Sequence, residues 1–166
     1  MSIIYKRRSI RKYQKKDVPD ELVIELIRAA MHAPSACNQQ PWHFVVIRDE
    51  RTKRKIAELH PYAKMAAEAP VVILVCGDPT LEECKGFWVQ DCSAAVENLL
   101  LRAAELGIGT VWCGVYPNKE RVKNFRKLLE IPEHVIPFAL VPVGYPAEHP
   151  EPEDRFKPER IHYEKW

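Results

Sequence analysis

The longest amphipathic pattern in the chain is the feature that most constrains its fold. Apolar residues recur there at steps of three and four, which predicts one long helix over residues 89–106. The apolar positions are Val89, Cys92, Val96, Leu99, Leu100, Ala103 and Leu106. Gly107 follows directly and supplies the left-handed residue that commonly ends a helix. We therefore expect 89–106 to be the central helix of the fold.

Shorter patterns on both sides predict that helices alternate with strands. Helical spacing predicts helices over 19–33, 50–59, 62–69 and 119–129. Short apolar and β-branched runs predict strands over 43–48, 71–76 and 136–143, and a strand with a turn over 108–115. Pro137 and Pro142 interrupt the last strand, and because proline cannot donate to a ladder we expect that strand at an edge or irregular. Beyond Gly144 the chain is rich in proline and charge, so it is expected to be disordered or to lie across another surface.

Length and composition set the class of protein. A chain of 166 residues that is 46% hydrophobic can bury one core, so we expect a single domain over 1–166. The longest apolar runs are far shorter than the roughly 20 residues that span a bilayer, and the N-terminus lacks a signal-peptide core. We expect a cytoplasmic protein without a membrane partner. The five cysteines are odd in number and form no CxxC pair, so free thiols in a reducing compartment are expected.

A basic cluster near the N-terminus is the first candidate site. It contains Arg7, Arg8, Ser9 and Arg11 within a stretch that runs from Lys6 to Lys12. Guanidinium groups meet phosphate oxygens in bidentate geometry, and a serine hydroxyl adds a hydrogen bond. The cluster therefore suits a phosphate. Taken alone it is equally typical of a solvated basic arm or of a patch that attracts nucleic acid.

A polar loop between the helix over 19–33 and the strand over 43–48 is the second candidate. Two prolines fix its path, and the side chains of Ser35, Asn38 and Gln40 can match the donors and acceptors of a heteroaromatic ring. The alternative is a turn stabilised by its own serine and asparagine, with Trp42 packed in the core. Composition alone does not separate the two.

Two further segments carry weaker signals. Residues 109–117 form a glycine-bearing strand exit where the backbone can approach a ligand closely, although Tyr116 there also suits ordinary packing. The tail contributes Arg155, Lys157 and Arg160, which either add charge to a phosphate site or are solvated. The sequence contains no GxGxxG, Walker A, GxSxG or HExxH motif, and its six histidines lack ligand-like spacing.

Taken together, these motifs resemble the FMN-dependent nitroreductase family. They are Arg7-Arg8-Ser9-x-Arg11, Ala33-Pro34-Ser35-x-x-Asn38-x-Gln40-Pro41-Trp42-x-Phe44, Gly107-x-Gly109-x-x-Trp112 and Lys157-x-x-Arg160, and they span essentially the whole chain. The resemblance implies an α+β fold, with a central, mostly antiparallel sheet flanked by helices. It also implies an intertwined homodimer whose tails, about 145–166, extend over the partner subunit.

The same resemblance assigns FMN-binding roles to positions of this sequence. Arg7, Ser9, Lys157 and Arg160 would hold the phosphate, with Arg155 as a substitute in the tail. Arg8 and Arg11 would approach the ribityl chain and the pyrimidine edge. The partner's loop would line the ring with Pro34, Ser35, Ala36, Asn38 and Gln40, and the ring would also face Trp112, Cys113 and Gly114.

The function implied is FMN-dependent reduction of nitroaromatic, quinone or similar acceptors by NADH or NADPH. Hydride would pass through flavin N5 in a ping-pong cycle, with no catalytic side chain and with Arg11 tuning the flavin electrostatically. No metal is expected, and nucleic acid is not an expected partner. A non-catalytic flavin-binding or redox-sensing module of the same fold remains an alternative. Relatives that dehalogenate iodotyrosine or fragment flavin use additional lid residues, and the short stretch 77–87 favours an open site instead.

Overall fold

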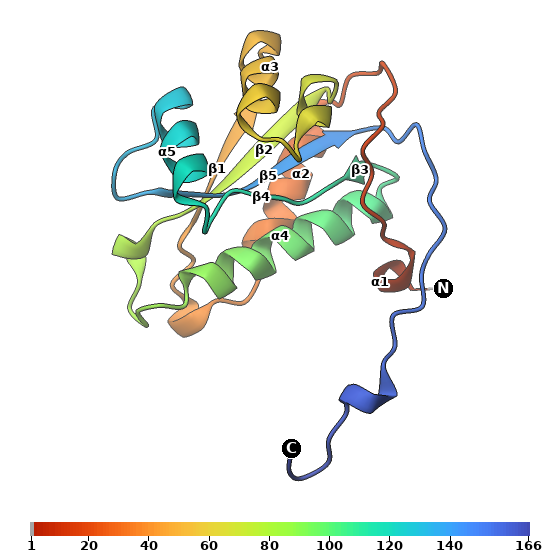
Figure 1. The fold of residues 1–166 in the computed structure, drawn as a ribbon, viewed down its shortest axis with the longest axis vertical. Helices are drawn as coiled ribbons and strands as arrows, with labels where there is room; N and C mark the ends of the chain where they lie inside the picture. Colours follow the sequence, from red (N-terminus) through yellow and green to blue (C-terminus); the bar gives the residue numbers. More distant parts are fainter. Residues whose placement is uncertain (1) are drawn as a thin grey trace.

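A five-stranded antiparallel sheet forms the centre of the protein, described here from a computed structural model of residues 2–166 (Figure 1). The strand order is β1-β2-β5-β3, and the short strand β4 also pairs with β5. The strands are β1 (Trp42–Ile47), β2 (Val71–Gly77), β3 (Gly109–Thr110), β4 (Cys113–Gly114) and β5 (Ile136–Gly144). All four pairings are antiparallel. The predicted α+β class with a mostly antiparallel sheet is confirmed.

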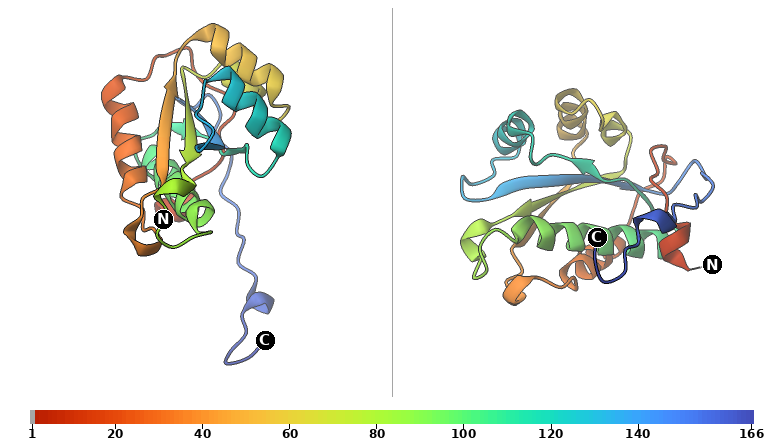
Figure 2. Two further views of the ribbon diagram at one scale, coloured as in Figure 1. Left: turned by 90° about the vertical axis from the view of Figure 1, so that its left-hand side faces the viewer. Right: turned by 60° about the horizontal axis from the view of Figure 1, so that its bottom comes forward.

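Helices cover both faces of this sheet, as Figure 2 shows. The helices α2 (Asp20–Met31) and α4 (Trp88–Glu105) pack on one face, and α3 (Glu50–Leu59) and α5 (Lys119–Leu128) pack on the other. Alternate residues of β2 enter the two cores, Ile73 and Val75 on the first face and Val72 and Leu74 on the second. A strand that is buried on both faces has no polar side, which explains the uninterrupted apolar run in its sequence.

Four of the predicted helices are present close to their expected ends. The helix predicted over 89–106 is α4, which lies across the sheet and is followed by Gly107 with φ +71°. The helix predicted over 62–69 is wrong, because only a short 3-10 helix, η2 (Lys64–Ala67), forms there. Pro61 and Pro70 bound this segment, and the residue before a proline is driven out of helical geometry. Too few residues remain for a stable α-helix.

The last strand, β5, was expected at an edge or irregular; it is irregular, but it is central in the sheet and not at an edge. It lies between β2 and the pair β3 and β4. Pro137 is tolerated because the register with β2 shifts beside it, pairing Cys76 with Pro137 and Val75 with Ala139. Pro142 lies opposite the gap between β3, which ends at residue 110, and β4, which begins at residue 113. Each proline therefore occupies a place where the ladder needs no donor.

The two ends of the chain run along the β3 side of the molecule. After the short helix α1 (Ile3–Lys6), the N-terminal arm makes a parallel bridge from Ser9 to Thr110 and an antiparallel one from Tyr13 to Pro146. The tail then leaves the body of the molecule, and residues 151–166 are all exposed (Figure 1). It contains one further 3-10 turn, η4 (Pro158–Arg160).

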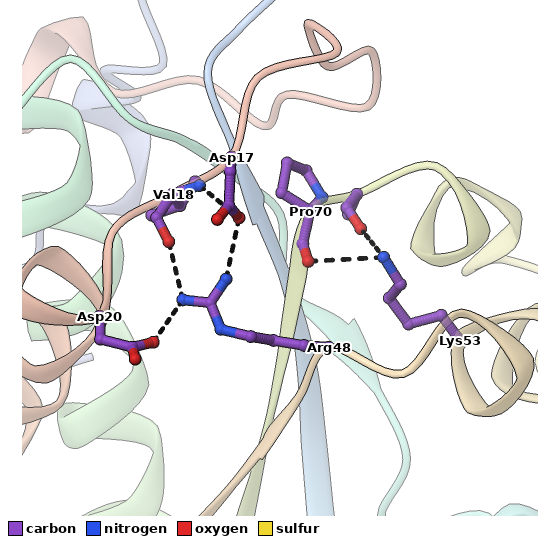
Figure 3. A network of polar contacts seen from close by, with 7 residues as sticks. Asp17, Val18, Asp20, Arg48, Lys53 and Pro70 are labelled. Atoms are coloured by element: carbon purple, nitrogen blue, oxygen red, sulfur yellow. Dashed lines mark hydrogen bonds and ion pairs between the residues drawn. The ribbon is translucent and has the colours of Figure 1, made fainter.

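Polar contacts fix the starts of α2 and α3 against the sheet (Figure 3). Arg48, directly after β1, donates to Asp17 at 3.0 Å, to Asp20 at 2.7 Å and to the Val18 carbonyl at 2.7 Å. Lys53 is buried and donates through Nζ to the carbonyl of Ala69 at 2.7 Å. Burial lowers the pKa of this ammonium group, and the carbonyl satisfies its buried donor.

Among residues 2–166, no helix has the length and apolar character needed to cross a membrane.

Candidate functional site

The basic N-terminal arm presents two partly shielded arginines. Nε of Arg7 lies 3.6 Å from Glu97 of α4, and Nη2 of Arg8 lies 2.9 Å from Glu153 of the tail. Their side chains are only 19% and 20% exposed, whereas the two glutamates are about half exposed. Ion pairs with such exposed carboxylates contribute little to stability. The arginines are thus held in place and remain available to a stronger anion.

The rest of the arm follows β3 toward β4. The Ile10 N–H donates to the Thr110 carbonyl at 2.9 Å, and the Ile10 side chain fills the space where a Cβ on Gly109 would lie 2.7 Å from it. The backbone N–H of Arg11 donates to Glu148 at 2.5 Å. Burial raises the pKa of the Cys113 thiol to about 11, and the nearby Arg11 charge partly opposes this rise. The structure therefore brings Arg11 into the neighbourhood of β4.

The segment from Trp112 to Gly114 has one open position. Trp112 packs edge-on against Phe138, with ring centroids 5.8 Å apart, and the Cys113 thiol is buried with Sγ 3.7 Å from the Tyr62 carbonyl. Gly114 is different, because the nearest atom to a Cβ built there is the Tyr116 carbonyl oxygen at 3.9 Å. A flat ligand can therefore approach the backbone at Gly114.

Two residues that the sequence analysis missed hold the carbonyl of Gly114. Nε2 of His60 lies 2.8 Å from this oxygen, and Nη1 of Arg121 donates to it at 3.1 Å. The N–H of Tyr62 points at Nδ1 of His60, at 3.2 Å, so Nδ1 accepts and Nε2 carries the proton. Burial lowers the pKa of His60 and favours this neutral ring. No motif marks either residue, since both act from the α3 and α5 layer.

The polar loop is stabilised largely by its own atoms. Oγ of Ser35 accepts the N–H of Gln40 at 3.0 Å, and Oδ1 of Asn38 accepts from the Gln40 side chain at 2.9 Å. The 3-10 turn η1 (Ala36–Asn38) lies between them, and Cys37, Asn38 and Gln40 have φ values of 51°, 54° and 48°. Trp42 packs in the core, as the structural alternative anticipated. Pro34 and Asn38 are nevertheless exposed, so the loop presents a surface as well.

Asp91 of α4 anchors this loop by accepting hydrogen bonds from it, and the sequence analysis missed this residue too. It is 4% exposed, and its carboxylate accepts the Ala36 N–H at 2.9 Å and the Gln39 amide at 2.6 Å. The Gln39 oxygen in turn accepts the N–H of Cys84 at 3.0 Å. The sequence contained a signal, because Asp91 falls between Trp88 and Cys92 on the apolar stripe of the helix. A carboxylate in that position needs buried donors.

The expectation of five free thiols is wrong for one pair. Cys37 of the loop is joined to Cys84, which follows the 3-10 turn η3 (Pro79–Leu81), with a Cα–Cα distance of 6.1 Å. A spacing of 47 residues carries no motif, so only the fold brings the two together. Cys76, Cys92 and Cys113 are free and buried. Within the described part of the chain, no cluster of His, Cys, Asp and Glu forms a metal site.

The polar loop and the basic arm approach α4 from different ends of the helix (Figure 1). The polar loop meets the helix at Asp91, near its start, whereas the arm meets it at Glu97 and then follows β3 beyond its end. Asp91 and Glu97 are about 9 Å apart along the helix axis at 1.5 Å per residue, and the arm continues from Glu97 away from the loop. Within residues 2–166, no hydrogen bond or ion pair joins the arginines of the arm to Pro34, Ser35, Ala36, Asn38 or Gln40.

The tail cations are also divided. Arg155 shares a groove of about 620 Å³ with Arg7, Arg8, Tyr5 and Phe156, between α1 and the tail. Lys157 and Arg160 lie further along the exposed tail and do not line this groove. Within one chain, Arg155 is thus the tail cation that joins the arginines of the arm.

Comparisons with known proteins match this geometry. The model of the nitroreductase family matches residues 4–61 and 59–145. A protein of Methanothermobacter thermautotrophicus, provisionally named NADH dehydrogenase/NAD(P)H nitroreductase, is 55% identical over 166 residues, covering 100% of this chain and 87% of its own. A Clostridium acetobutylicum structure, provisionally called an NADH oxidase, has a TM-score of 0.95 at 43% identity and covers 99% and 100% of the two chains. A Desulfovibrio desulfuricans structure, provisionally called a nitroreductase and solved in complex with FMN, has a TM-score of 0.85 at 32% identity, covering 99% and 95%.

Proposed function

Because the chain belongs to the nitroreductase family, we propose that it is an FMN-dependent oxidoreductase. It would use NADH or NADPH to reduce nitroaromatic, quinone or similar electron-poor acceptors. One observation carries the proposal: the bridge from Ser9 to Thr110 sets the arginines of the arm along the strand that leads to the open backbone of Gly114. FMN is the cofactor of the D. desulfuricans relative.

The donors of the arm fit the phosphate of FMN. Arg7 and Arg8 are held in place by acidic partners that a phosphate can displace. Ser9, which follows them in the sequence and precedes Arg11, adds a hydroxyl donor. A phosphate monoester carries nearly two charges and accepts bidentate hydrogen bonds, so it competes well with one exposed carboxylate. Arg155 is the tail cation best placed to add to this site, and Lys157 and Arg160 would join it only if the tail moved.

The ring of FMN fits the far end of the same surface. Gly114 leaves its backbone open, and Trp112 and Cys113 support it from the core. We place Arg11 near the polar edge of the ring, since it follows Ile10, whose N–H donates to Thr110, where the arm runs parallel to the segment that leads to Gly114. The ring needs a second wall, and the polar loop at Pro34, Ser35, Ala36, Asn38 and Gln40 has the chemistry to provide one.

That second wall requires a homodimer, because in one chain the loop lies at the other end of α4. The outer side of α4 carries the small or apolar residues Ala94, Leu101 and Ala104, none of them fully buried. Ile4, Tyr5 and Phe156 are 65%, 69% and 70% exposed in the single chain. We therefore propose that residues 1–166 form one domain, that two copies pair along α4, and that each tail lies over its partner.

When bound, FMN supplies the two-electron chemistry, and the protein supplies orientation and charge. Arg11 places a fixed positive charge where negative charge develops, and such preorganised charge is effective because it needs no rearrangement. The open approach at Gly114 would admit a donor and then an acceptor to the same place, which is what the proposed ping-pong cycle requires. The residues of the site contain no obvious general acid, so protons would come from solvent.

Two measurements test this function. The purified protein should show an oxidised flavin spectrum and release FMN on denaturation, and NADH or NADPH should bleach that spectrum rapidly in a stopped-flow experiment. The Arg11→Ala variant should make reduction less favourable and shift the flavin midpoint potential, whereas Arg51→Ala, on an exposed turn of α3, should not. A protein that binds FMN but is not bleached would be a non-catalytic flavin module, and a protein without affinity for FMN would overturn the proposal.

A further inference from the structure

The peptide at Gly114 is held from behind by the layer that faces away from α4. The Val115 N–H donates to the Phe138 carbonyl of β5, at 3.0 Å. Because polar groups alternate along a strand, the N–H and carbonyl of the preceding residue, Gly114, point away from β5. No strand pairs with β4 on that side within residues 2–166. Gly114 therefore directs its N–H and its carbonyl toward an edge of β4 that is not paired with another strand.

His60 and Arg121 fix the carbonyl at that edge. His60 is 1% exposed and follows the last turn of α3, and Arg121 lies in the first turn of α5, so two separate elements converge on one oxygen. The ring of His60 cannot rotate freely, since Nδ1 is engaged by the Tyr62 N–H and the ring lies between Tyr62 and Phe125. Because the Gly114 carbonyl accepts two hydrogen bonds, one of them from a ring that is itself held in place, the backbone of Gly114 has little freedom to rotate.

We propose that His60 and Arg121 are positioning residues for the ring-binding edge of the site. They hold the Gly114 carbonyl, so that the N–H of the same residue, which points to the same edge, keeps a fixed direction toward the flat ligand. Glycine is needed there for close approach, but its mobility opposes a defined donor. The two residues remove that mobility without touching the ligand themselves. This inference rests on the proposed function, because the ligand is the FMN ring.

Three variants and a control separate positioning from folding. His60→Leu removes the donor, whereas His60→Gln keeps a side-chain N–H at the place of Nε2 and should restore binding. Arg121→Met removes the second donor from a half-buried position and is expected to fold normally. Lys123→Met, an exposed position in α5, is the matched control. Each apo-protein would first be compared by thermal unfolding.

The readout is the dissociation constant for FMN and for riboflavin, measured by quenching of flavin fluorescence. His60→Leu and Arg121→Met should each weaken both flavins by about tenfold, the effect of one lost hydrogen bond of ordinary strength. The equal effect on riboflavin, which lacks the phosphate, locates the change at the ring. His60→Gln and Lys123→Met should stay within about twofold of the wild type.

The outcomes are distinct from those of the proposed function. If the wild type binds FMN and Arg121→Met binds both flavins equally well, the positioning role is wrong although the function stands. If His60→Gln is as weak as His60→Leu while both fold, the hydrogen bond to Gly114 is not what matters, and the role is again wrong. If the wild type binds neither flavin, the proposed function itself fails.

Discussion

Replacement of Asp91 by alanine should loosen the polar loop while the rest of the fold persists. The carboxylate accepts two hydrogen bonds, from the Ala36 N–H at 2.9 Å and the Gln39 amide at 2.6 Å. Hydrogen bonds to charged groups contribute about 1.5–3 kcal/mol each, and the lower value applies here because the loop is partly exposed and water can replace the lost acceptor. The variant should therefore lose about 3 kcal/mol of unfolding free energy. For a chain of this size that is a fall in Tm of roughly 6–12 °C.

The Asp91→Asn variant sharpens the test. One amide oxygen can still accept from Ala36, but the new NH2 group would face the Gln39 amide donor. Gln39 cannot simply flip, because its oxygen already accepts from the Cys84 N–H at 3.0 Å. We expect about half the loss of the alanine variant, so the order of stability is wild type, asparagine, alanine.

Thermal unfolding followed by circular dichroism, at one protein concentration and without added FMN, measures this order. Gln90→Ala is the matched control, because Gln90 is the exposed neighbour on the same helix. A Tm for Asp91→Ala no lower than that of Gln90→Ala would refute the reasoning, since the two contacts would then carry no net stability.

Three further predictions use other parts of the structure. Arg7→Ala should weaken FMN by at least tenfold yet leave riboflavin binding unchanged, with Arg51→Ala as the control; equal losses for both flavins would remove Arg7 from the phosphate site. Burial lowers the pKa of His60 below its ordinary value of 6.5, so the unfolded chain binds a proton there that the folded chain refuses. Stability should be complete above pH 6.5 and decline as the pH falls below it, and this decline should be smaller in His60→Gln; identical Tm profiles from pH 5 to 8 would contradict it. Deletion of residues 151–166, all exposed in the single chain, should preserve the far-UV spectrum and weaken dimerisation in sedimentation velocity, whereas an unchanged dimer would show that the tail is not part of the interface.

The parts of the fold that the sequence predicted are those governed by local pattern. The apolar stripe of 89–106 predicts α4, and the unbroken apolar run of 71–76 predicts a strand, which the structure covers on both faces. For 136–143 the sequence predicted an edge strand or an irregular one, and the strand is irregular but central. The features that let a central strand hold two prolines belong to other segments: the register shift opposite Pro137 and the gap between β3 and β4 opposite Pro142. Such features depend on residues far away in the chain.

The same division applies to the candidate site. Arg7, Ser9 and Asn38 belong to compact motifs that sequence alone can recognise. His60, Asp91 and Arg121 do not, because each acts on a backbone group that only the fold brings near. The Cys37–Cys84 pair is similar, since its spacing carries no signal until the fold brings η1 beside the segment that follows η3. Residues that hold backbone groups in place are thus harder to predict than the residues that we propose bind the ligand.

In the proposed homodimer, α4 would bring the two separate halves of the proposed site together. It fixes the polar loop through Asp91 near its start and contacts the arm through Glu97 further along, so the separation of the two half-sites is set by a rigid element. If α4 packs antiparallel on a second copy of itself, the start of one helix lies beside the end of the other. The loop of one subunit then faces the arm of its partner, and symmetry produces two identical sites at once. A mutation that separates the subunits should therefore abolish flavin binding even though every predicted ligand-binding residue is intact.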